Sequence, residues 1–412
     1  MITILGGGIA GLSLAYYLSN KIPGKKIIIL EKEKNLGGVC RYTHISDKLF
    51  PICYHHIMLS DKHTLKLVND LCLEKELFWV KSTMSFYKSE NYYTLSSVGD
   101  ILSYPNLSYK DKAVLIVFIL KCLFGFFDRI DYSIKARDFI IKKTNKRVYL
   151  EIFEPLLRFK FADLKDGIMA KWVIERIKVK EANSMFGFLR SGNGSIIDEL
   201  EKNLRMRGVN IINNCLVKKI NLSKNKSGNF VIDAVNNNGE LNLYSNKIVS
   251  TFPWGEFIKL IKNPDEVGLN QFRNIKYTKA ISVIINLKKK LNIPYWTNNL
   301  DSRFKIGGFF NYPSKSSLVY LAKYVSKFNK GDDDKIVSEF MKICKLKSSD
   351  IRDKRAYLIH NADPLPDNFY DLGQLNKLKK EGMFFVGINT LPFKTNLDSA
   401  IFSAKSAVKG LI

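Results

Sequence analysis

The chain begins with an apolar run that ends in glycines and is followed by a segment with helical spacing. Residues 2–5 (ITIL) precede the glycines, and residues 9–20 place Leu12, Ala15 and Leu18 on one helical face. A second apolar run, residues 26–30 (KIIIL), then ends at an acidic residue. An apolar run of this length is typical of a buried strand. The pattern predicts one β-α-β unit at the start of the chain.

The pattern changes between residues 65 and 188. An aromatic, strand-like segment (MSFYKSENYYTL) is followed by helical patterns at 112–127 and 148–161. These features predict an inserted domain. From residue 192 the β-α pattern returns with a glycine turn (SGNGS), a helix to about residue 207, a strand (VNIINN), a hairpin (230–235 and 241–244) and a buried strand (KIVSTF).

After residue 253 the β-α pattern is interrupted a second time, by a segment with a strand at 280–287 and a helix near 334–344. The chain closes with a strand (MFFVGIN) and a helix over 397–411. We therefore predict an α/β protein with two discontinuous domains. The first consists of residues 1–60, 192–255 and 376–412, and the second of residues 61–191 and 256–375.

The composition is that of a globular protein. The 412 residues, 46% of them hydrophobic, suffice for two domains. The six cysteines are scattered, without a CxxC pair or a cluster with histidine, which favours reduced thiols and no metal site. The start of the chain lacks the features of a signal peptide, and the apolar run 114–127 is shorter than the roughly 20 residues of a spanning helix. We expect a cytoplasmic protein.

The net charge of +26 favours anionic partners, which include nucleotides, lipid headgroups and nucleic acids. Lysine is spread along the whole chain together with abundant asparagine and isoleucine, so a general compositional bias explains the excess at least as well as binding does. The sequence contains no recognisable nucleic-acid-binding module, and we expect no nucleic-acid partner.

Gly6, Gly8 and Gly11 form a GxGxxG motif between the first strand and the first helix, and Glu31 follows 20 residues beyond Gly11. The first glycine permits the tight turn, the second lets the backbone approach a diphosphate, and the third lets the helix pack closely on the strand. The helix start then offers free N–H groups to the diphosphate. Glu31 can accept hydrogen bonds from ribose hydroxyls, which disfavours NADP.

A second glycine pair, Gly37-Gly38, follows six residues after Glu31. A second close approach of the backbone to the diphosphate explains this pair and favours FAD over NAD. An ordinary turn is the alternative.

The sequence resembles the flavin amine oxidase superfamily, which includes monoamine and polyamine oxidases, protoporphyrinogen oxidase, carotenoid desaturases and, more distantly, UDP-galactopyranose mutase. Four segments carry the resemblance in the order that the family uses: ILGGGIAGLSLAYYL, LEKEKNLGGVC, FLRSGNGSIIDELEKNLRMRGVNIINNCLVKKI and FFVGIN. The resemblance implies a Rossmann-like FAD-binding domain of the GR2 type with a discontinuous α+β substrate domain. The absence of a cysteine near the C-terminus implies that FAD is bound non-covalently.

The resemblance also implies cofactor-binding residues. It assigns Gly6, Gly8, Gly11, Glu31, Gly37 and Gly38 to the ADP half of FAD. It places the backbone of Val217 against the adenine, although an ordinary strand residue explains Val217 equally well. It places Gly387 beside the ribityl diphosphate. The chain departs from the family at Asn389, where an acidic residue is common. It also departs at Val39, where many relatives have an arginine directly after the glycine pair. Arg41 either takes the role of that arginine or is a surface charge.

Three side chains are candidates for the chemistry. His55 and His56 follow the glycine pair by a short hairpin, where relatives bring the chain past the flavin, and either one can instead be a packed or solvated histidine. Lys279 lies in a segment (KYTKAISVIINL) similar to the strand of polyamine oxidases whose lysine holds a water near flavin N5. Because lysine is frequent here, a chance match is the stronger explanation.

The resulting hypothesis is an FAD-dependent oxidoreductase that transfers a hydride from a substrate carbon, of an amine or a hydrophobic molecule, to flavin N5. The first alternative is a mutase-like isomerase of sugar nucleotides, which would use paired arginines among Arg158, Arg176 and Arg190. The second is a non-catalytic FAD-binding scaffold or membrane-associated chaperone. A small molecule, hydrophobic or nucleotide-linked, is the expected partner, and peripheral membrane contact and the oligomeric state stay open.

Overall fold

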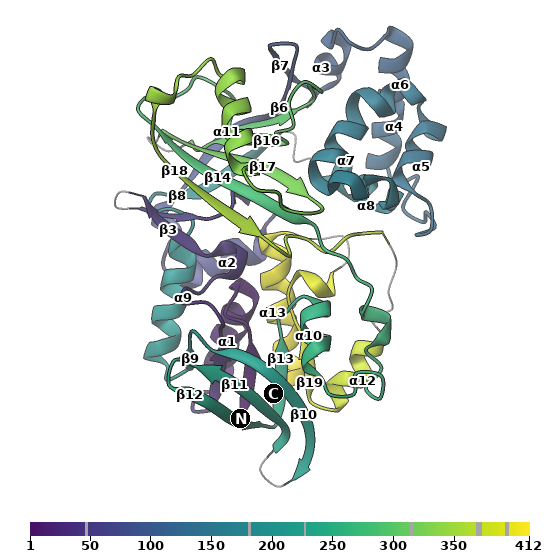
Figure 1. The fold of residues 1–412 in the computed structure, drawn as a ribbon. Helices are drawn as coiled ribbons and strands as arrows, with labels where there is room; N and C mark the ends of the chain where they lie inside the picture. Colours follow the sequence, from purple (N-terminus) through teal and green to yellow (C-terminus); the bar gives the residue numbers. More distant parts are fainter. Residues whose placement is uncertain (46–47, 180–182, 226–227, 314–316, 368–372, 392–394) are drawn as a thin grey trace. The chain divides into compact units, whose positions relative to one another are not determined.

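The computed structural model describes the chain except residues 46–47, 180–182, 226–227, 314–316, 368–372 and 392–394 (Figure 1). The chain divides into two units. Unit 1 comprises residues 1–77, 188–276 and 370–412, and unit 2 comprises residues 78–187 and 277–369. Each unit is thus assembled from segments that are distant in the sequence.

Unit 1 is built on a parallel sheet with the strand order β19-β13-β1-β2-β9. Every residue of β1 and β2 is buried, as expected for parallel strands covered on both faces. The strands are β1 (Ile2–Leu5), β2 (Ile27–Leu30), β9 (Asn210–Ile212), β13 (Lys247–Ser250) and β19 (Met383–Phe385).

The helices of unit 1 are α1 (Ile9–Lys21), α2 (Lys62–Asp70), α9 (Ser195–Met206), α10 (Trp254–Leu260), α12 (Gln374–Lys380) and α13 (Leu397–Leu411). Helix α1 lies between α9 and α13 (Figure 1), which explains why residues 9–18 are all buried. The other strands are β3 (Tyr42–Ile45), β4 (Lys48–Pro51) and β5 (Ile57–Met58), and the antiparallel sheet of β10 (Leu216–Asn225), β11 (Gly228–Asn236) and β12 (Gly239–Ser245).

Unit 2 contains a mixed sheet in which β14 (Lys279–Leu287) lies between β17 (Leu318–Val325) and β18 (Ile351–Ile359). The strand order continues from β17 through β16 (Gly308–Asn311), β15 (Trp296–Asn299) and β6 (Leu77–Lys88) to β8 (Asn183–Leu189), and β7 (Asn91–Thr94) pairs with β6. Helix α11 (Asp332–Ile343) packs on β14 and β17. Its buried Phe340 contacts Phe309 with ring centroids 5.3 Å apart.

A helical cluster completes unit 2, with α3 (Val98–Ser103), α4 (Tyr109–Leu123), α5 (Ala136–Lys143), α6 (Lys146–Val148), α7 (Glu154–Phe161) and α8 (Ala170–Val179). The rings of Phe118, Phe139 and Phe153 meet in its core, with Phe118 5.9 Å from Phe139 and 5.7 Å from Phe153. In the described part of the chain, no helix combines the length and the apolar character needed to cross a bilayer.

The β-α-β unit, the hairpin of β11 and β12, and the final helix are confirmed. The expected helix over 112–127 is instead α4, which begins at Tyr109 because the Ser108 side chain accepts a hydrogen bond from the Asp111 amide. It ends at Leu123 because Gly125 adopts a left-handed φ of +80°. The expected helix over 148–161 contains a π-helical turn, Tyr149–Phe153, before α7.

The units also differ from the domain ranges expected from the sequence, since residues 61–77 and 256–276 belong to unit 1. One reason is that the Asp398 carboxylate of α13 accepts hydrogen bonds from the amides of His63 (2.8 Å) and Thr64 (2.7 Å) at the start of α2. Another is that Trp254 and Phe272 stack in the core of unit 1, with ring centroids 4.0 Å apart.

Candidate functional site

Of the three glycines of the GxGxxG motif at the amino end of α1, the fold requires Gly6 and Gly11 but not Gly8. Gly6 has a φ of +106°, and a Cβ added there would lie 2.2 Å from the Thr251 hydroxyl. A Cβ on Gly11 would lie 2.1 Å from the carbonyl oxygen of Gly6, so this glycine lets α1 pack against β1. A Cβ on Gly8 would meet the Gly38 Cα at 3.9 Å, an ordinary contact. Gly8 therefore leaves space beside the backbone that packing alone does not explain.

The second glycine pair lies directly against the first. Gly37 and Gly8 form a parallel β-bridge, and the Gly37 amide donates to the Gly7 carbonyl over 2.8 Å. Gly37 and Gly38 both have left-handed backbones, with φ of +108° and +59°. A Cβ on Gly38 would lie 3.4 Å from the Gly8 Cα. The two motifs thus form one glycine surface.

Glu31 is buried at the end of β2, beside this surface. One carboxylate oxygen accepts a hydrogen bond from the Gly7 amide (2.7 Å), and the other accepts one from the Glu33 amide (2.9 Å). A carboxylate oxygen has two lone pairs, so each retains capacity for another donor. The two bonds fix Glu31 where it can also accept hydrogen bonds from ribose hydroxyls.

Gly387 brings the C-terminal part of the chain to the same place. It has a φ of +102°, and a Cβ there would lie 3.4 Å from the Ala10 Cβ in the first turn of α1. The Gly387 amide donates to the Ser403 hydroxyl of α13 over 3.1 Å. Three glycine segments therefore meet at the start of α1.

Asn389 is buried in the turn after Gly387 and has a clear packing role. Its side-chain amide donates to the Phe252 carbonyl over 3.0 Å, and its backbone carbonyl accepts from the Trp254 indole over 3.1 Å. These contacts explain why an amide suits this position where relatives commonly have an acid.

Val217 is buried in β10, two residues after Cys215, whose amide donates to the Glu31 carbonyl over 2.8 Å. This bond holds the start of β10 beside the end of β2. Arg41 is half-buried after Gly38, and its amide donates to the Gly38 carbonyl over 3.2 Å. In the described part of the chain its guanidinium has no hydrogen bond or ion pair, so it is available to an anion.

His55 is held at both ring nitrogens. Nδ1 lies 2.9 Å from the Cys53 carbonyl oxygen and must therefore donate to it, and Nε2 lies 3.6 Å from Cys40 Sγ. Burial raises the pKa of the Cys40 thiol to about 12, which favours the protonated thiol beside the ring. These contacts hold the imidazole ring in a fixed position.

The sequence did not indicate that Asn193 would contribute to this arrangement. Its side-chain amide donates to the His55 carbonyl over 3.0 Å, and its side-chain oxygen accepts from the Leu189 amide over 2.8 Å. Asn193 is buried in the SGNGS turn, and Gly192 in that turn packs against the Leu49 carbonyl. The sequence feature that could have indicated a structural role for Asn193 is its position between two glycines, Gly192 and Gly194.

His56 is half-buried just before β5 in unit 1. Lys279 is the first residue of β14 in unit 2, with its Nζ 5.9 Å from the centre of the Phe328 ring. The structure thus brings the glycines, Glu31 and Val217 together in unit 1, while Lys279 belongs to the other unit. The catalytic roles of His55, His56 and Lys279 stay predictions.

The arrangement in unit 1 suits a dinucleotide. The first turn of α1 consists of the uncharged residues Ile9, Ala10 and Gly11, whose amides have no partner within the helix because the first helical bond runs from Leu12 to Gly8. Such amides and the helix dipole attract a diphosphate. Gly8 offers the space in which a backbone can approach it, and Glu31 offers the ribose acceptor.

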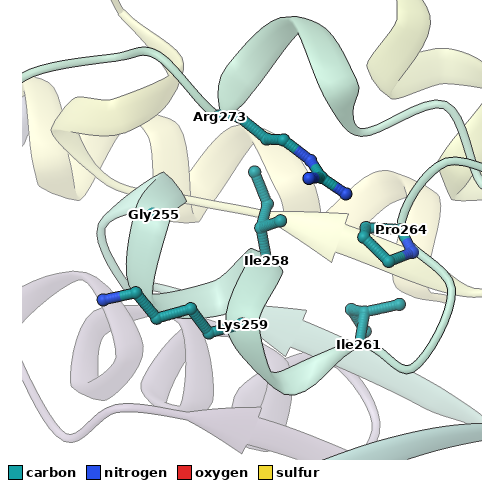
Figure 2. A pocket seen from close by; sticks show the side chains of 6 residues that line it. All are labelled: Gly255, Ile258, Lys259, Ile261, Pro264 and Arg273. Atoms are coloured by element: carbon teal, nitrogen blue, oxygen red, sulfur yellow. The ribbon is translucent and has the colours of Figure 1, made fainter.

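A hollow of about 380 Å³ also occurs on unit 1, along α10 (Figure 2). It is lined by Gly255, Ile258, Lys259, Ile261, Pro264 and Arg273, none of which belongs to the glycine segments. Arg273 is paired with Asp265 at 2.8 Å. We therefore assign the candidate site to the glycine surface and not to this hollow.

Comparisons with known proteins agree with this reading of unit 1. Residues 4–71 match the model of the NAD(P)-binding Rossmann-like domain family. No curated protein matches the sequence of the chain significantly.

Solved structures share the fold over nearly the whole chain. A reduced UDP-galactopyranose mutase has a TM-score of 0.76 and 14% identity over 99% of this chain and 94% of its own. A fatty acid isomerase from P. acnes, which produces CLA, has a TM-score of 0.73 and 13% identity over 99% and 97%. A putrescine oxidase redesigned in its cofactor binding has a TM-score of 0.71 and 10% identity over 100% and 98%. These matches confirm the expected fold, a Rossmann-like domain combined with a second, discontinuous domain.

Proposed function

We propose that this chain binds FAD non-covalently and acts as an oxidoreductase that removes a hydride from a carbon atom of a small molecule. The observation that carries the proposal is the meeting of Gly8, Gly37-Gly38 and Gly387 at the start of α1, beside the fixed carboxylate of Glu31. The shared fold with a mutase, an isomerase and an amine oxidase supports it.

The residues of unit 1 would divide the cofactor between them. The backbone at Gly8 and Gly38 would approach the diphosphate together with the free amides of α1, and Arg41 would add a positive charge. Glu31 would accept hydrogen bonds from the ribose, and the backbone of Val217 would lie against the adenine. The turn at Gly387 would lie beside the ribityl chain, with the start of α13 directed at the flavin pyrimidine.

We favour FAD over NAD because of the second glycine pair. A nicotinamide site requires one glycine turn after the first strand, and Gly37-Gly38 forms a second one that bonds directly to the first. The carboxylate of Glu31 would repel the 2′-phosphate of NADP.

When bound, FAD would supply the two-electron acceptor for the reaction. The ring of His55, held by its contacts with Cys53 and Cys40, would keep the chain between Cys40 and β5 in place. His56 would donate or accept a proton near neutral pH. The ammonium group of Lys279 would stabilise negative charge and hold a water molecule. The expected substrate is an amine or a hydrophobic molecule.

The test begins with the visible absorption spectrum of the purified protein before and after heat denaturation, with the mass of any released cofactor. Released FAD is the expected result. A colourless protein that also fails to bind added FAD would overturn the proposal. Anaerobic titration with amines and hydrophobic donors then tests redox function, and bound FAD that no donor reduces would indicate a non-catalytic scaffold.

The mutase-like alternative has less support from the contacts of the arginines. Arg158 lies 3.9 Å from Glu154 within α7, and Arg176 lies over the Trp172 ring at 5.4 Å within α8, so each guanidinium is engaged on its own helix. Arg190 belongs to unit 1. Isomerisation of a sugar nucleotide by the chemically reduced protein would reverse this preference.

A further inference from the structure

Helix α4 is apolar on two faces, and only one of them packs within unit 2. Leu115, Phe118 and Cys122 are buried in the core of the helical cluster. Val117, Leu120 and Phe124 follow a second stripe at helical spacing, and they are 49%, 41% and 76% exposed. A surface helix normally carries polar residues on its outer side. The outer side of α4 therefore requires a separate explanation.

The exposed stripe continues beyond the end of the helix. The Phe126 amide donates to the Lys121 carbonyl over 3.0 Å, which folds the turn back on the last residues of α4, and Phe126 is 72% exposed. We call Val117, Leu120, Phe124 and Phe126 the outer α4 face. Two largely exposed phenylalanines, Phe124 and Phe126, thus form an apolar edge at this end of the helix.

Basic residues flank this face. Lys110 and Lys121 of α4 are exposed and form no ion pair with other residues in the described ranges. The nearest acidic residue in the turn, Asp128, is paired with Lys178. The polar border of the outer α4 face is thus positively charged.

We propose that the outer α4 face binds the surface of an anionic lipid bilayer, with the helix lying in the headgroup region. Large apolar side chains bordered by lysines are typical of such helices, because the stems of the lysines extend along the apolar layer while their ammonium groups contact lipid phosphates. A second copy of this chain fits less well, because it would bring the same unpaired lysines and a net charge of +26 against each other. This inference does not depend on FAD binding.

The experiment is co-sedimentation of the full chain with vesicles of phosphatidylcholine alone or mixed with phosphatidylserine. We expect binding to the anionic vesicles, and about a tenfold weaker partition for each phenylalanine replaced in the variants Phe124→Ser and Phe126→Ser. Replacement of Lys110 or Lys121 by Gln should weaken the partition about fivefold each, and added salt should weaken it further.

Met206 of α9 provides the matched control, because it is 70% exposed on unit 1. The variant Met206→Ser should bind vesicles like the unchanged chain, and circular dichroism should show that all variants are folded. Failure of the unchanged chain to bind anionic vesicles would overturn the proposal, as would equal binding by the double phenylalanine variant. A dimer in solution that the double variant separates would also overturn it, because the face would then be a contact between copies.

Discussion

Gly8 and Gly11 lie three residues apart at the start of α1, and we expect alanine at these positions to have opposite consequences. In Gly11→Ala the new Cβ would lie 2.1 Å from the Gly6 carbonyl oxygen, which belongs to the backbone and cannot rotate away. In Gly8→Ala the nearest atom, the Gly38 Cα, lies at 3.9 Å. The first change should damage the fold, and the second should damage cofactor binding.

The magnitudes follow from these distances. Overpacking at Gly11 costs about 3 kcal/mol, and the higher helix propensity of alanine returns about 1 kcal/mol, so stability should fall by about 2 kcal/mol. At Gly8, alanine as the N-cap costs less than about 1 kcal/mol. The methyl group would occupy the space that we assign to the diphosphate. Loss of one hydrogen bond to a charged group weakens binding by about 1.5–3 kcal/mol, which corresponds to roughly ten- to a hundredfold in Kd.

The assay pairs urea unfolding, followed by circular dichroism, with titration of FAD into the apoprotein. Gly255→Ala in α10 is the control, since an added Cβ there meets no atom within 4 Å; it should leave FAD binding unchanged and should not lower stability. If Gly8→Ala binds FAD as tightly as the unchanged chain, the assignment of Gly8 to close approach is wrong. If Gly11→Ala is fully stable, the inferred clash with Gly6 is wrong.

Three further predictions concern charge and burial. Glu31→Gln should weaken FAD binding and destabilise unit 1 by about 1–3 kcal/mol, because one of the two backbone amides that Glu31 accepts from loses its acceptor. The titration and unfolding assays above measure both effects, and in these assays the control Glu33→Gln, at an exposed position, should change little. The free energy of unfolding should fall above about pH 9, because the Cys40 thiol ionises there in the unfolded chain, whereas burial raises its pKa in the folded chain to about 12. Urea unfolding at rising pH should show a smaller fall in this free energy for Cys40→Ser than for the unchanged chain. Lys160→Met should destabilise unit 2 by about 3 kcal/mol, because it leaves the buried Asp363 carboxylate without its cationic partner. If thermal unfolding shows that the free energy of unfolding falls by less than about 1 kcal/mol, this reasoning is wrong.

The β-α-β unit could be predicted from the sequence because its determinants are local. Two apolar runs, a glycine turn and a terminal acid follow one another within 31 residues, and each restricts the backbone near its own position. The same locality explains why the site could be predicted at Gly8 and Glu31. The fold then brings Gly387 to the first turn of α1, which only the family resemblance had indicated.

Other parts depend on contacts between distant residues, which no local pattern encodes. The bond from Asn193 to the His55 carbonyl joins residues 138 positions apart. The bonds from α2 to Asp398 join residues more than 330 positions apart, and they help to explain why α2 belongs to unit 1. The end of α4 was misplaced for another reason, since the apolar pattern continues through Gly125 and onto an exposed surface.

The parallel sheet of unit 1 has a consequence for how the chain folds during synthesis. The central strand β1 (Ile2–Leu5) pairs with β13 (Lys247–Ser250), which in turn pairs with β19 (Met383–Phe385). At about 5–20 residues per second, a ribosome needs on the order of tens of seconds to deliver β13 after β1 has emerged. Throughout this interval one edge of the apolar strand β1 has no native partner. Nascent unit 1 should therefore be a substrate for chaperones that bind apolar strands, whereas unit 2 can complete its sheet before β19 is made.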